Sequence, residues 1–345
     1  MSPAAPGPRN LITDVAGLRV GQAQDDAARS GVTVIVADGR AVCAVDVRGG
    51  APGTRETDVL APENLVDAAD AVVLAGGSVY GLAAADGVTA ALGAAGLGYR
   101  MSPAPGVPVS PIVPAAILYD LGNGGAKEWG ETPPYRALGM AALRGAGLEF
   151  ALGTAGAGAG AMAGRLKGGI GSASAATEDG FTVGAIVAVN SFGSVVAPGG
   201  RTFWAAPYEI AGEFGGLGSA GLVAAPDDWG LSKGPAAGDL AGERANTTIA
   251  CVATDATLTP AEAKRLAIMA QDGLARAIRP AHAPFDGDIV FAFATGRRAL
   301  GERRTLDLAR LGALAADCLA RAIARGVFEA TAWPGTTVQG WRDLR

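Results

Sequence analysis

The chain has 345 residues, of which 49% are hydrophobic and 18% charged, and its 28 basic and 33 acidic residues give a net charge of −5. This composition is enough for a large globular core, and without a run of like charge it argues against nucleic acid as a partner. The apolar tracts are broken by aspartates and the first ten residues lack a secretory signal, so we expect a cytoplasmic protein that does not span a membrane.

In the first part of the chain, short β-branched runs alternate with helical stretches. Residues 32–37 and 41–47 are predicted to form paired strands around the turn between them. Residues 71–75 are predicted as a strand, followed by the glycine pair Gly76-Gly77 and a helix over residues 79–95. Such a turn points backbone N–H groups into a cleft. The glycine spacing matches no nucleotide-binding motif, so packing and binding roles both stay open.

The middle of the chain is rich in glycine and alanine from residue 148 onward. Small residues of this kind let a segment lie closely against another backbone. Strands are predicted at residues 181–189, ending at Asn190, and at residues 194–197. Residues 198–244 lack periodicity and are predicted to form a long, mobile loop.

The last hundred residues have the most regular pattern. Residues 247–254 are predicted as a strand because of their β-branched content. Thr259, Pro260 and Glu262 form a capping box that opens an amphipathic helix reaching about residue 278. Another strand is predicted at residues 288–294, and a helix at residues 306–325 closed by Gly326. Strands and helices in this alternation predict layered α/β packing.

His282 is the only histidine, and this excludes several mechanisms. A Ser-His-Asp triad would have to use it, and a zinc site with two or three imidazoles cannot be built within the chain. Its place in a proline-flanked turn favours a surface or packing role. The three cysteines lie far apart in mostly apolar surroundings, which is typical of reduced core residues: Cys43, Cys251 and Cys318.

Thr247 offers a chemistry that needs no histidine. Where a loop enters a strand, its hydroxyl can attack the carbonyl of Asn246 and shift the acyl group from nitrogen to oxygen, after which water cleaves the ester. The freed α-amine of Thr247, with a reference pKa of about 7.7 to 8.0, can accept the proton of its own hydroxyl. The same residues also permit a plain loop end. A glycosylation acceptor is not expected without a secretory signal.

Motifs spread over nearly the whole chain support the first interpretation: Asn10-Leu11-Ile12-Thr13-Asp14-Val15, Val47-Arg48-Gly49-Gly50, Gly76-Gly77-Ser78 with Tyr80-Gly81-Leu82, Asn190 at a strand end, Asn246-Thr247-Thr248-Ile249 with Ala253-Thr254-Asp255, and Phe285-Asp286-Gly287-Asp288. Together they resemble the self-cleaving aminopeptidase family, which contains L-aminopeptidase/D-esterases, β-peptidyl aminopeptidases and nylon-oligomer hydrolases. A threonine nucleophile with an Asp-Gly-Asp pair, in place of serine with Ser-x-Glu, is closest to the nylon-oligomer (6-aminohexanoate oligomer) branch.

The resemblance implies an α/β fold, a four-layer αββα sandwich of the N-terminal-nucleophile hydrolase type. It implies one domain, residues 1–345, cut into a larger fragment 1–246 and a smaller fragment 247–345 that stay together and form a homo-oligomer. No metal or organic cofactor is needed. The implied site residues are the nucleophile Thr247, the new carboxyl terminus Asn246, the orienting pair Asp286 and Asp288, the oxyanion amide Asn190, a site lysine Lys167, and Tyr119, which would bind substrate or the oxyanion.

The substrate is not determined by these motifs. A short peptide with a free amino end, a β-peptide and a polyamide oligomer are all consistent with amide hydrolysis. Two rival functions stay open at this point: an acyltransferase of the same fold that passes the acyl group from Thr247 to an amine, and a small-molecule binding module that uses the Gly76-Gly77 turn and never cleaves.

Overall fold

A computed structural model describes residues 4–220, 222–233 and 246–344. The long strands are β1 (Leu18–Asp25), β2 (Ser30–Val47), β4 (Ala68–Ala75), β8 (Ile170–Ala176), β9 (Thr182–Asn190), β10 (Thr247–Ala256) and β11 (Ile289–Arg298). The short strands are β3 (Thr54–Arg55), β5 (Ala115–Ile117), β6 (Met162–Ala163) and β7 (Leu166–Lys167). The α-helices are α1 (Ala83–Ala94), α2 (Tyr135–Arg144), α3 (Pro260–Ala270), α4 (Asp272–Ala277) and α5 (Arg304–Phe328).

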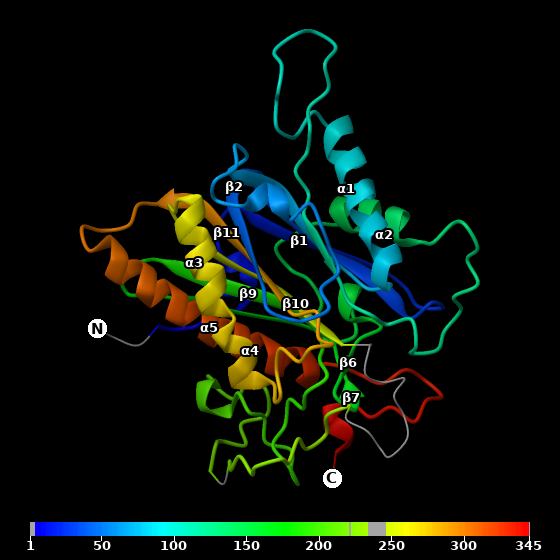
Figure 1. Ribbon diagram of the computed structural model, residues 1–345. Coiled ribbons are helices and arrows are strands. Elements are labelled where there is room, and N and C mark those ends of the chain that lie inside the picture. The colour runs from blue at the N-terminus through cyan, green and yellow to red at the C-terminus, as the bar shows by residue number, and fades with distance from the viewer. Residues whose placement is uncertain (1–3, 221, 234–245, 345) are drawn as a thin grey trace.

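The strands lie in two layers between two layers of helices (Figure 1). Successive residues of a strand face opposite sides, so each strand contributes to two cores. Ile35 of β2 and Phe291 of β11 belong to the central core between the strand layers. Val34 instead packs in the core with α1 and α2, and Val290 in the core with α3, α4 and α5. These three cores confirm the predicted four-layer αββα arrangement.

One strand, β2, connects the two strand layers. The pairing order is β3-β5-β4-β2-β11-β10-β9-β8, with β1 also paired to β2. The predicted hairpin between residues 32–37 and 41–47 is therefore wrong, because both belong to this single strand. The pairing of β2 with β4 shifts register between Val36 and Ala41, and Gly39 takes a φ of +91° there. The positive φ of this glycine thus accommodates a register shift within one strand and not a chain reversal.

Most of the other predicted elements are present, with changed ends. The predicted helix over residues 79–95 begins as a 3-10 turn (Ser78–Leu82) before α1, and the helix from Thr259 breaks at Gln271 into α3 and α4. Helix α5 continues past Gly326 to Phe328. The predicted strand at residues 194–197 is wrong, because those residues make only isolated bridges.

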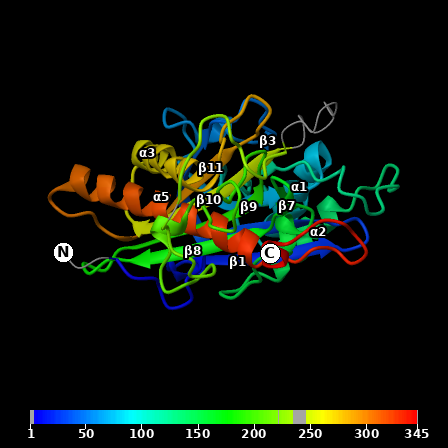
Figure 2. The ribbon, with the colours of Figure 1, turned by 90° about the horizontal axis from the view of Figure 1, so that it is seen from below.

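Strand β8 was missed because its sequence consists mostly of small residues. Figure 2 shows α5 lying along this strand. A Cβ atom at Gly171 would lie 1.8 Å from the carbonyl oxygen of Ala322 in α5. Glycine is therefore required by the close approach of the helix, and the strand lacks the β-branched pattern that signals strands in a sequence.

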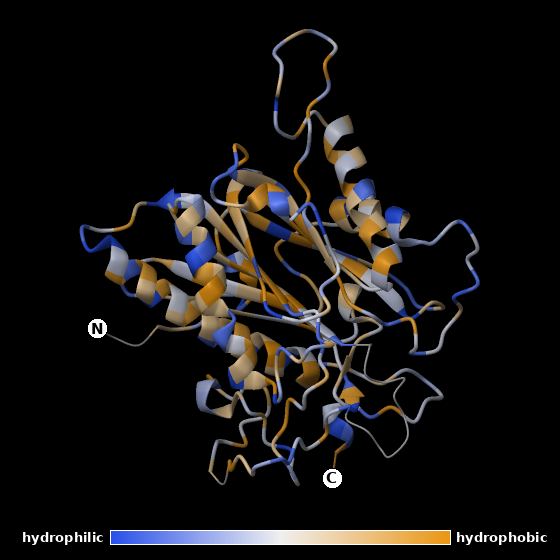
Figure 3. Cartoon of the chain, in the orientation of Figure 1, coloured by the Kyte–Doolittle hydropathy of each residue, from blue (hydrophilic) through white to orange (hydrophobic). Residues whose placement is uncertain are grey.

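The predicted mobile loop, residues 198–244, falls only partly within the described residues. Phe203 and Phe214 are buried and belong to the core beside α5, so this part of the segment is packed. Figure 3 shows the strands between the helix layers as mostly hydrophobic. The three cysteines are free and buried, as predicted. Among the described residues, no helix combines the length and apolarity that crossing a bilayer would need.

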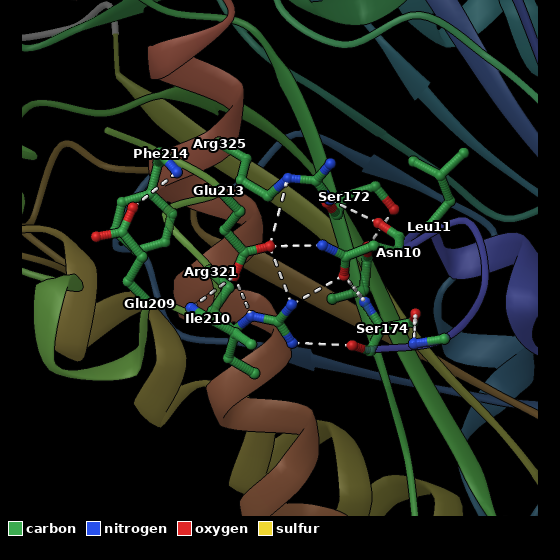
Figure 4. A network of polar contacts seen from close by, with 12 residues as sticks. Asn10, Leu11, Ser172, Ser174, Glu209, Ile210, Glu213, Phe214, Arg321 and Arg325 are labelled. Carbon is green, nitrogen blue, oxygen red and sulfur yellow. Dashed lines mark hydrogen bonds and ion pairs between the residues drawn. The ribbon is translucent and has the colours of Figure 1, made fainter. Parts of the chain in front are cut away.

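A buried polar network ties α5 to the start of the chain (Figure 4). Arg321 donates from Nε to Glu213 at 2.5 Å, and from its other nitrogens to Asn10 Oδ1 and the Ser174 carbonyl, both at 2.8 Å. Asn10 Nδ2 also donates to Glu213, at 2.5 Å. Arg321 is 2% exposed, so these contacts compensate an otherwise costly buried charge. The network joins residues that precede Thr247 to a helix that follows it.

Candidate active site

Thr247 begins β10 in the interior of the sheet. It lies opposite Asn190, the last residue of β9, and the preceding Asn246 forms a parallel bridge with Asp286. Thr247 is 4% exposed and Asn246 2%. The peptide bond between them is thus held by three segments that are distant in sequence.

The carbonyl oxygen of Asn246 accepts two hydrogen bonds. The backbone N–H of Gly287 donates to it at 3.0 Å, and the hydroxyl of Thr247 donates to it as well. A Cβ atom at position 287 would lie 2.7 Å from Thr247 Oγ1. Glycine between the two aspartates therefore leaves space for the threonine side chain, a requirement that the Asp-Gly-Asp motif alone did not reveal.

Asp288 fixes the residue after Thr247. Its Oδ1 accepts from the backbone N–H of Thr248 at 2.8 Å. Its Oδ2 lies 3.0 Å from the backbone N and 2.9 Å from Nδ1 of His282. His282, which the sequence assigned to a surface or packing role, therefore contacts a predicted site residue. Its uniqueness in the sequence is the one sequence signal that sets it apart.

Asp286 makes different contacts. Its Oδ2 accepts from the Ala283 N–H at 2.9 Å and its Oδ1 from the Phe192 N–H at 3.4 Å. Burial, followed by the charge of Asp288, raises the pKa of Asp286 to about 6, while Lys233 opposes this rise. The two carboxylates, expected to share a face because they are two residues apart, both lie buried around the start of β10.

Asn190 and Tyr119 are brought together. Asn190 Oδ1 accepts from the backbone N–H of Met162 at 2.9 Å, and its Nδ2 donates to the backbone carbonyl of Tyr119 at 3.1 Å. These bonds fix the orientation of the amide next to Thr247. Tyr119 contributes its backbone carbonyl to this contact, and the residue is 36% exposed.

Lys167 is fully buried beside this group. Its ammonium donates to three carbonyl oxygens, those of Gly158 at 3.0 Å, Ala161 at 3.0 Å and Gly168 at 2.7 Å. Its Nζ also lies 4.8 Å from the ring centroid of Trp333. Burial lowers the pKa of Lys167 to about 7. One of these acceptors, Ala161, precedes Met162, whose backbone N–H donates to Asn190, so the described contacts of Lys167 reach the amide through this turn.

Lys233 was not predicted as a site residue. Its Nζ lies 3.4 Å from the carbonyl oxygen of Asn190, and its backbone N–H donates to the Phe192 carbonyl at 2.9 Å. Although the residue is half-buried, burial around its ammonium lowers the pKa to about 7, and Asp286 raises it. The lysine lies in a segment without periodicity, so no pattern in the sequence indicated its position.

An open cavity of about 410 Å³ adjoins these residues, lined by Met162, Gly164, Arg165, Lys233, Thr337 and Val338. A larger one of about 840 Å³ lies between the ends of α1 and α2 and the β1–β2 pair, away from Thr247. The smaller cavity adjoins the candidate site, because Met162 and Lys233 line it and both contact Asn190.

The arrangement combines three features that acyl transfer needs. A hydroxyl contacts a peptide carbonyl, a rigid backbone N–H already donates to that carbonyl oxygen, and buried carboxylates fix the surrounding backbone. A donor placed where negative charge develops lowers the barrier by about 3 kcal/mol.

Comparison with known proteins places the chain among peptidases and amide hydrolases. Residues 10–339 match peptidase family S58. The chain is 45% identical to a Mycobacterium tuberculosis protein described as an uncharacterized aminopeptidase, over 97% of this chain and 98% of that one. It is 30% identical to a 6-aminohexanoate-oligomer endohydrolase of Agromyces sp., over 91% of this chain and 84% of that one.

Two solved structures share the fold. A beta-aminopeptidase of Burkholderia sp. superimposes with a TM-score of 0.69 at 24% identity, and the match covers 99% of this chain and 93% of that one. The L-aminopeptidase D-Ala-esterase/amidase of Ochrobactrum anthropi, described as a variant of the Ntn hydrolase fold, gives the same TM-score and coverage at 21% identity.

Proposed function

The chain belongs to peptidase family S58 and is a hydrolase that acts on amide bonds, and from this we propose that it cuts its own Asn246–Thr247 bond and then works through Thr247. One observation carries the proposal. The Thr247 hydroxyl contacts the carbonyl oxygen of Asn246, which also accepts the Gly287 N–H at 3.0 Å. The nucleophile, the bond to be cut and a donor for the oxyanion are thus adjacent before any cleavage.

Self-cleavage would proceed in two balanced steps. The Thr247 oxygen bonds to the Asn246 carbonyl carbon, the carbon–nitrogen bond breaks, and the hydroxyl proton ends on the released amine. Water then attacks the resulting ester, giving the Asn246 carboxyl group and restoring the Thr247 hydroxyl. Gly287 N–H stabilises the oxyanion, and Asp288 holds the Thr248 amide so that β10 stays in place as its first residue becomes a chain end.

The mature enzyme would repeat the same chemistry on an external amide. The α-amine of Thr247 takes the hydroxyl proton, and the acyl group passes to Thr247 and then to water. Asp286 and Asp288 orient the nucleophile, and the Asn190 amide, held by the backbone of Met162 and Tyr119, serves the oxyanion. Lys167 supports the turn before Met162 through the Ala161 carbonyl. We propose short peptides, β-peptides or polyamide oligomers as substrates, following the activities that the names of the relatives and of the solved structures describe.

The fragments would remain associated after the cut, because β10 is paired on one side with β9 of the larger fragment and on the other with β11. The Arg321–Glu213 network adds a second connection between them (Figure 4). A cytoplasmic homo-oligomer of such pairs remains our expectation.

The deciding measurement is the intact mass and N-terminal sequence of the purified protein. We expect two polypeptides, the smaller beginning at Thr247. A single full-length species that still turns over an amide would contradict the proposal. Adding a primary amine during turnover distinguishes hydrolysis from acyl transfer, since a transferase would form the conjugate in preference to the free acid.

A further inference from the structure

Lys233 is joined through its backbone to Phe192, a residue that also contacts Asp286 and lies in an aromatic cluster. The ring of Phe192 lies between those of Trp229 and Phe285, with centroid distances of 5.9 Å and 4.6 Å. Phe192 also accepts the Lys233 backbone N–H and donates its own N–H to Asp286. Lys233 and Asp286 are therefore held on the two sides of one residue.

The described charged groups near Asp286 are Asp288 and Lys233, with His282 beyond Asp288. Asp288 follows it by two residues, and His282 contacts Asp288 at 2.9 Å. Arg48 reaches Asp288 only through its backbone, because its guanidinium lies 2.6 Å from Asp46 on the outer side. Among the described charged groups near Asp286, Lys233 is the cation that favours its ionised form.

The charge of Asp286 affects the scissile bond through the backbone. Its two oxygens accept the N–H groups of Phe192 and Ala283, which holds the turn over residues 283–287 against the segment that follows β9. That turn presents the Gly287 N–H to the Asn246 carbonyl. A protonated Asp286 is a weaker acceptor, so losing its charge would loosen the turn that carries the oxyanion donor.

We propose that Lys233 is a positioning residue that keeps Asp286 ionised and thereby sets the lower pH limit of self-cleavage. This inference rests on the proposed function. Lys233 acts through Asp286 and does not touch the bond that is cut. It differs from Lys167, whose ammonium is satisfied by three carbonyl oxygens and which serves the turn behind Asn190.

The sign of the effect follows from the charges. Burial and the charge of Asp288 raise the pKa of Asp286 to about 6, while the hydrogen bonds from the Ala283 and Phe192 N–H groups, and after them the charge of Lys233, restrain that rise. Removing the lysine raises this pKa further, so Asp286 stays protonated up to a higher pH. The acidic limb of the cleavage profile should then move upward, while the rate well above that pKa should change little.

The experiment uses full-length chain made in a short pulse of cell-free synthesis and moved into buffers from about pH 5 to about pH 9. The uncut fraction is followed by denaturing gel and intact mass. For Lys233→Met we expect the acidic midpoint to rise by about one pH unit and the rate near pH 6 to fall about fivefold. Lys233→Arg should restore the parent midpoint, because it keeps the cation.

Lys167→Met is the matched control, a second buried lysine whose charge is coupled to Asp120 and not to Asp286, so its loss should lower the rate but leave the acidic midpoint in place. Where Lys233→Met folds poorly, Lys233→Gln, which is uncharged but polar, takes its place with the same expected midpoint. In an Asp286→Asn background, where no carboxylate titrates at this position, Lys233→Met should add no further pH dependence. A Lys233→Met midpoint equal to that of the cleaving parent overturns the role of Lys233 alone. A parent that is never cut at Thr247 overturns this inference together with the proposed function.

Discussion

Two buried polar clusters of this molecule differ in how their charges are balanced. In the network of Figure 4, Arg321 faces Glu213 directly, and Asn10 satisfies both. In the turn over residues 283–288, two carboxylates lie two residues apart and the pKa of Asp286 is raised to about 6. The first cluster resembles a compensated structural contact. The second keeps an unfavourable excess of negative charge, which is typical of a site that performs chemistry.

This comparison predicts that changes at the turn affect chemistry with little effect on stability, and that changes at the network do the reverse. The largest effect is expected for Thr247→Ala. Without a hydroxyl there is no group to attack the Asn246 carbonyl, so the chain should stay uncut and amide turnover should fall by about 10³-fold or more.

Intact mass and an amide-hydrolysis assay measure both losses. Thr247→Ser, which keeps the hydroxyl, is the control and should still be cut. Turnover that survives in Thr247→Ala would remove this residue from the mechanism.

The next largest effect is expected for Gly287→Ala. The new methyl group would lie 2.7 Å from Thr247 Oγ1 and 2.9 Å from the carbonyl oxygen of Ala51, so the threonine or the turn that carries the oxyanion donor must move. We expect the cleavage rate to fall about 10²-fold or more, comparable to losing one oxyanion donor.

Gly93→Ala in α1 is the matched control, because the new methyl would meet only ordinary contacts there, 3.8 Å from Pro111. It should leave cleavage intact and stabilise the helix slightly. Equal cleavage rates for the two glycine variants would show that space beside Thr247 is not limiting.

Glu213→Gln tests the network. Arg321 would keep its buried charge without a charged partner, which typically costs about 3–5 kcal/mol of unfolding free energy. Cleavage by the molecules that remain folded should be unchanged. Denaturant titration gives the stability, and intact mass gives the cleavage.

The control is Glu329→Gln, which removes the exposed partner of Arg342 and should cost less than about 1 kcal/mol. If Glu213→Gln slowed cleavage without loss of stability, the network of Figure 4 would take part in the chemistry and not only in stability.

The smallest effect is expected for His282→Ala. Its ring contacts Asp288 Oδ2, but the backbone N–H of the same residue contacts the same oxygen at 3.0 Å and survives the change. Asp288 should therefore stay oriented, and cleavage should slow only a few fold, by roughly one hydrogen bond of about 1 kcal/mol. A loss as large as that of Thr247→Ala would instead give the imidazole a direct role in proton transfer.

The sequence was most informative where a signal is local. The β-branched content of β10 and the capping box at Thr259 specify their own conformations, and the structure has both, including the bond from Glu262 N to Thr259 at 3.3 Å. The site residues could be proposed because Asn246-Thr247 and Asp286-Gly287-Asp288 are short motifs with their own chemistry. Their roles remain predictions.

The sequence was least informative where distant contacts decide the structure. Gly39 and its neighbours resemble a hairpin turn, yet β2 continues because β4 and β11 pair with its two halves. The glycines of β8 have meaning only once α5 lies against them. Lys233 is distant in sequence from Asn190 and Phe192, which it contacts, and it lies in a segment with no pattern of its own.

The position of Thr247 at the head of an interior strand has one more consequence. Its surroundings exist only after β9, β10, β11 and the turn before β11 have come together from three parts of the chain. A chain that cuts itself there would therefore report on its own completed folding, since misassembled molecules would lack the catalyst. The nick would act as a quality check that needs no chaperone or protease, and uncut material in a preparation would mark the misfolded fraction.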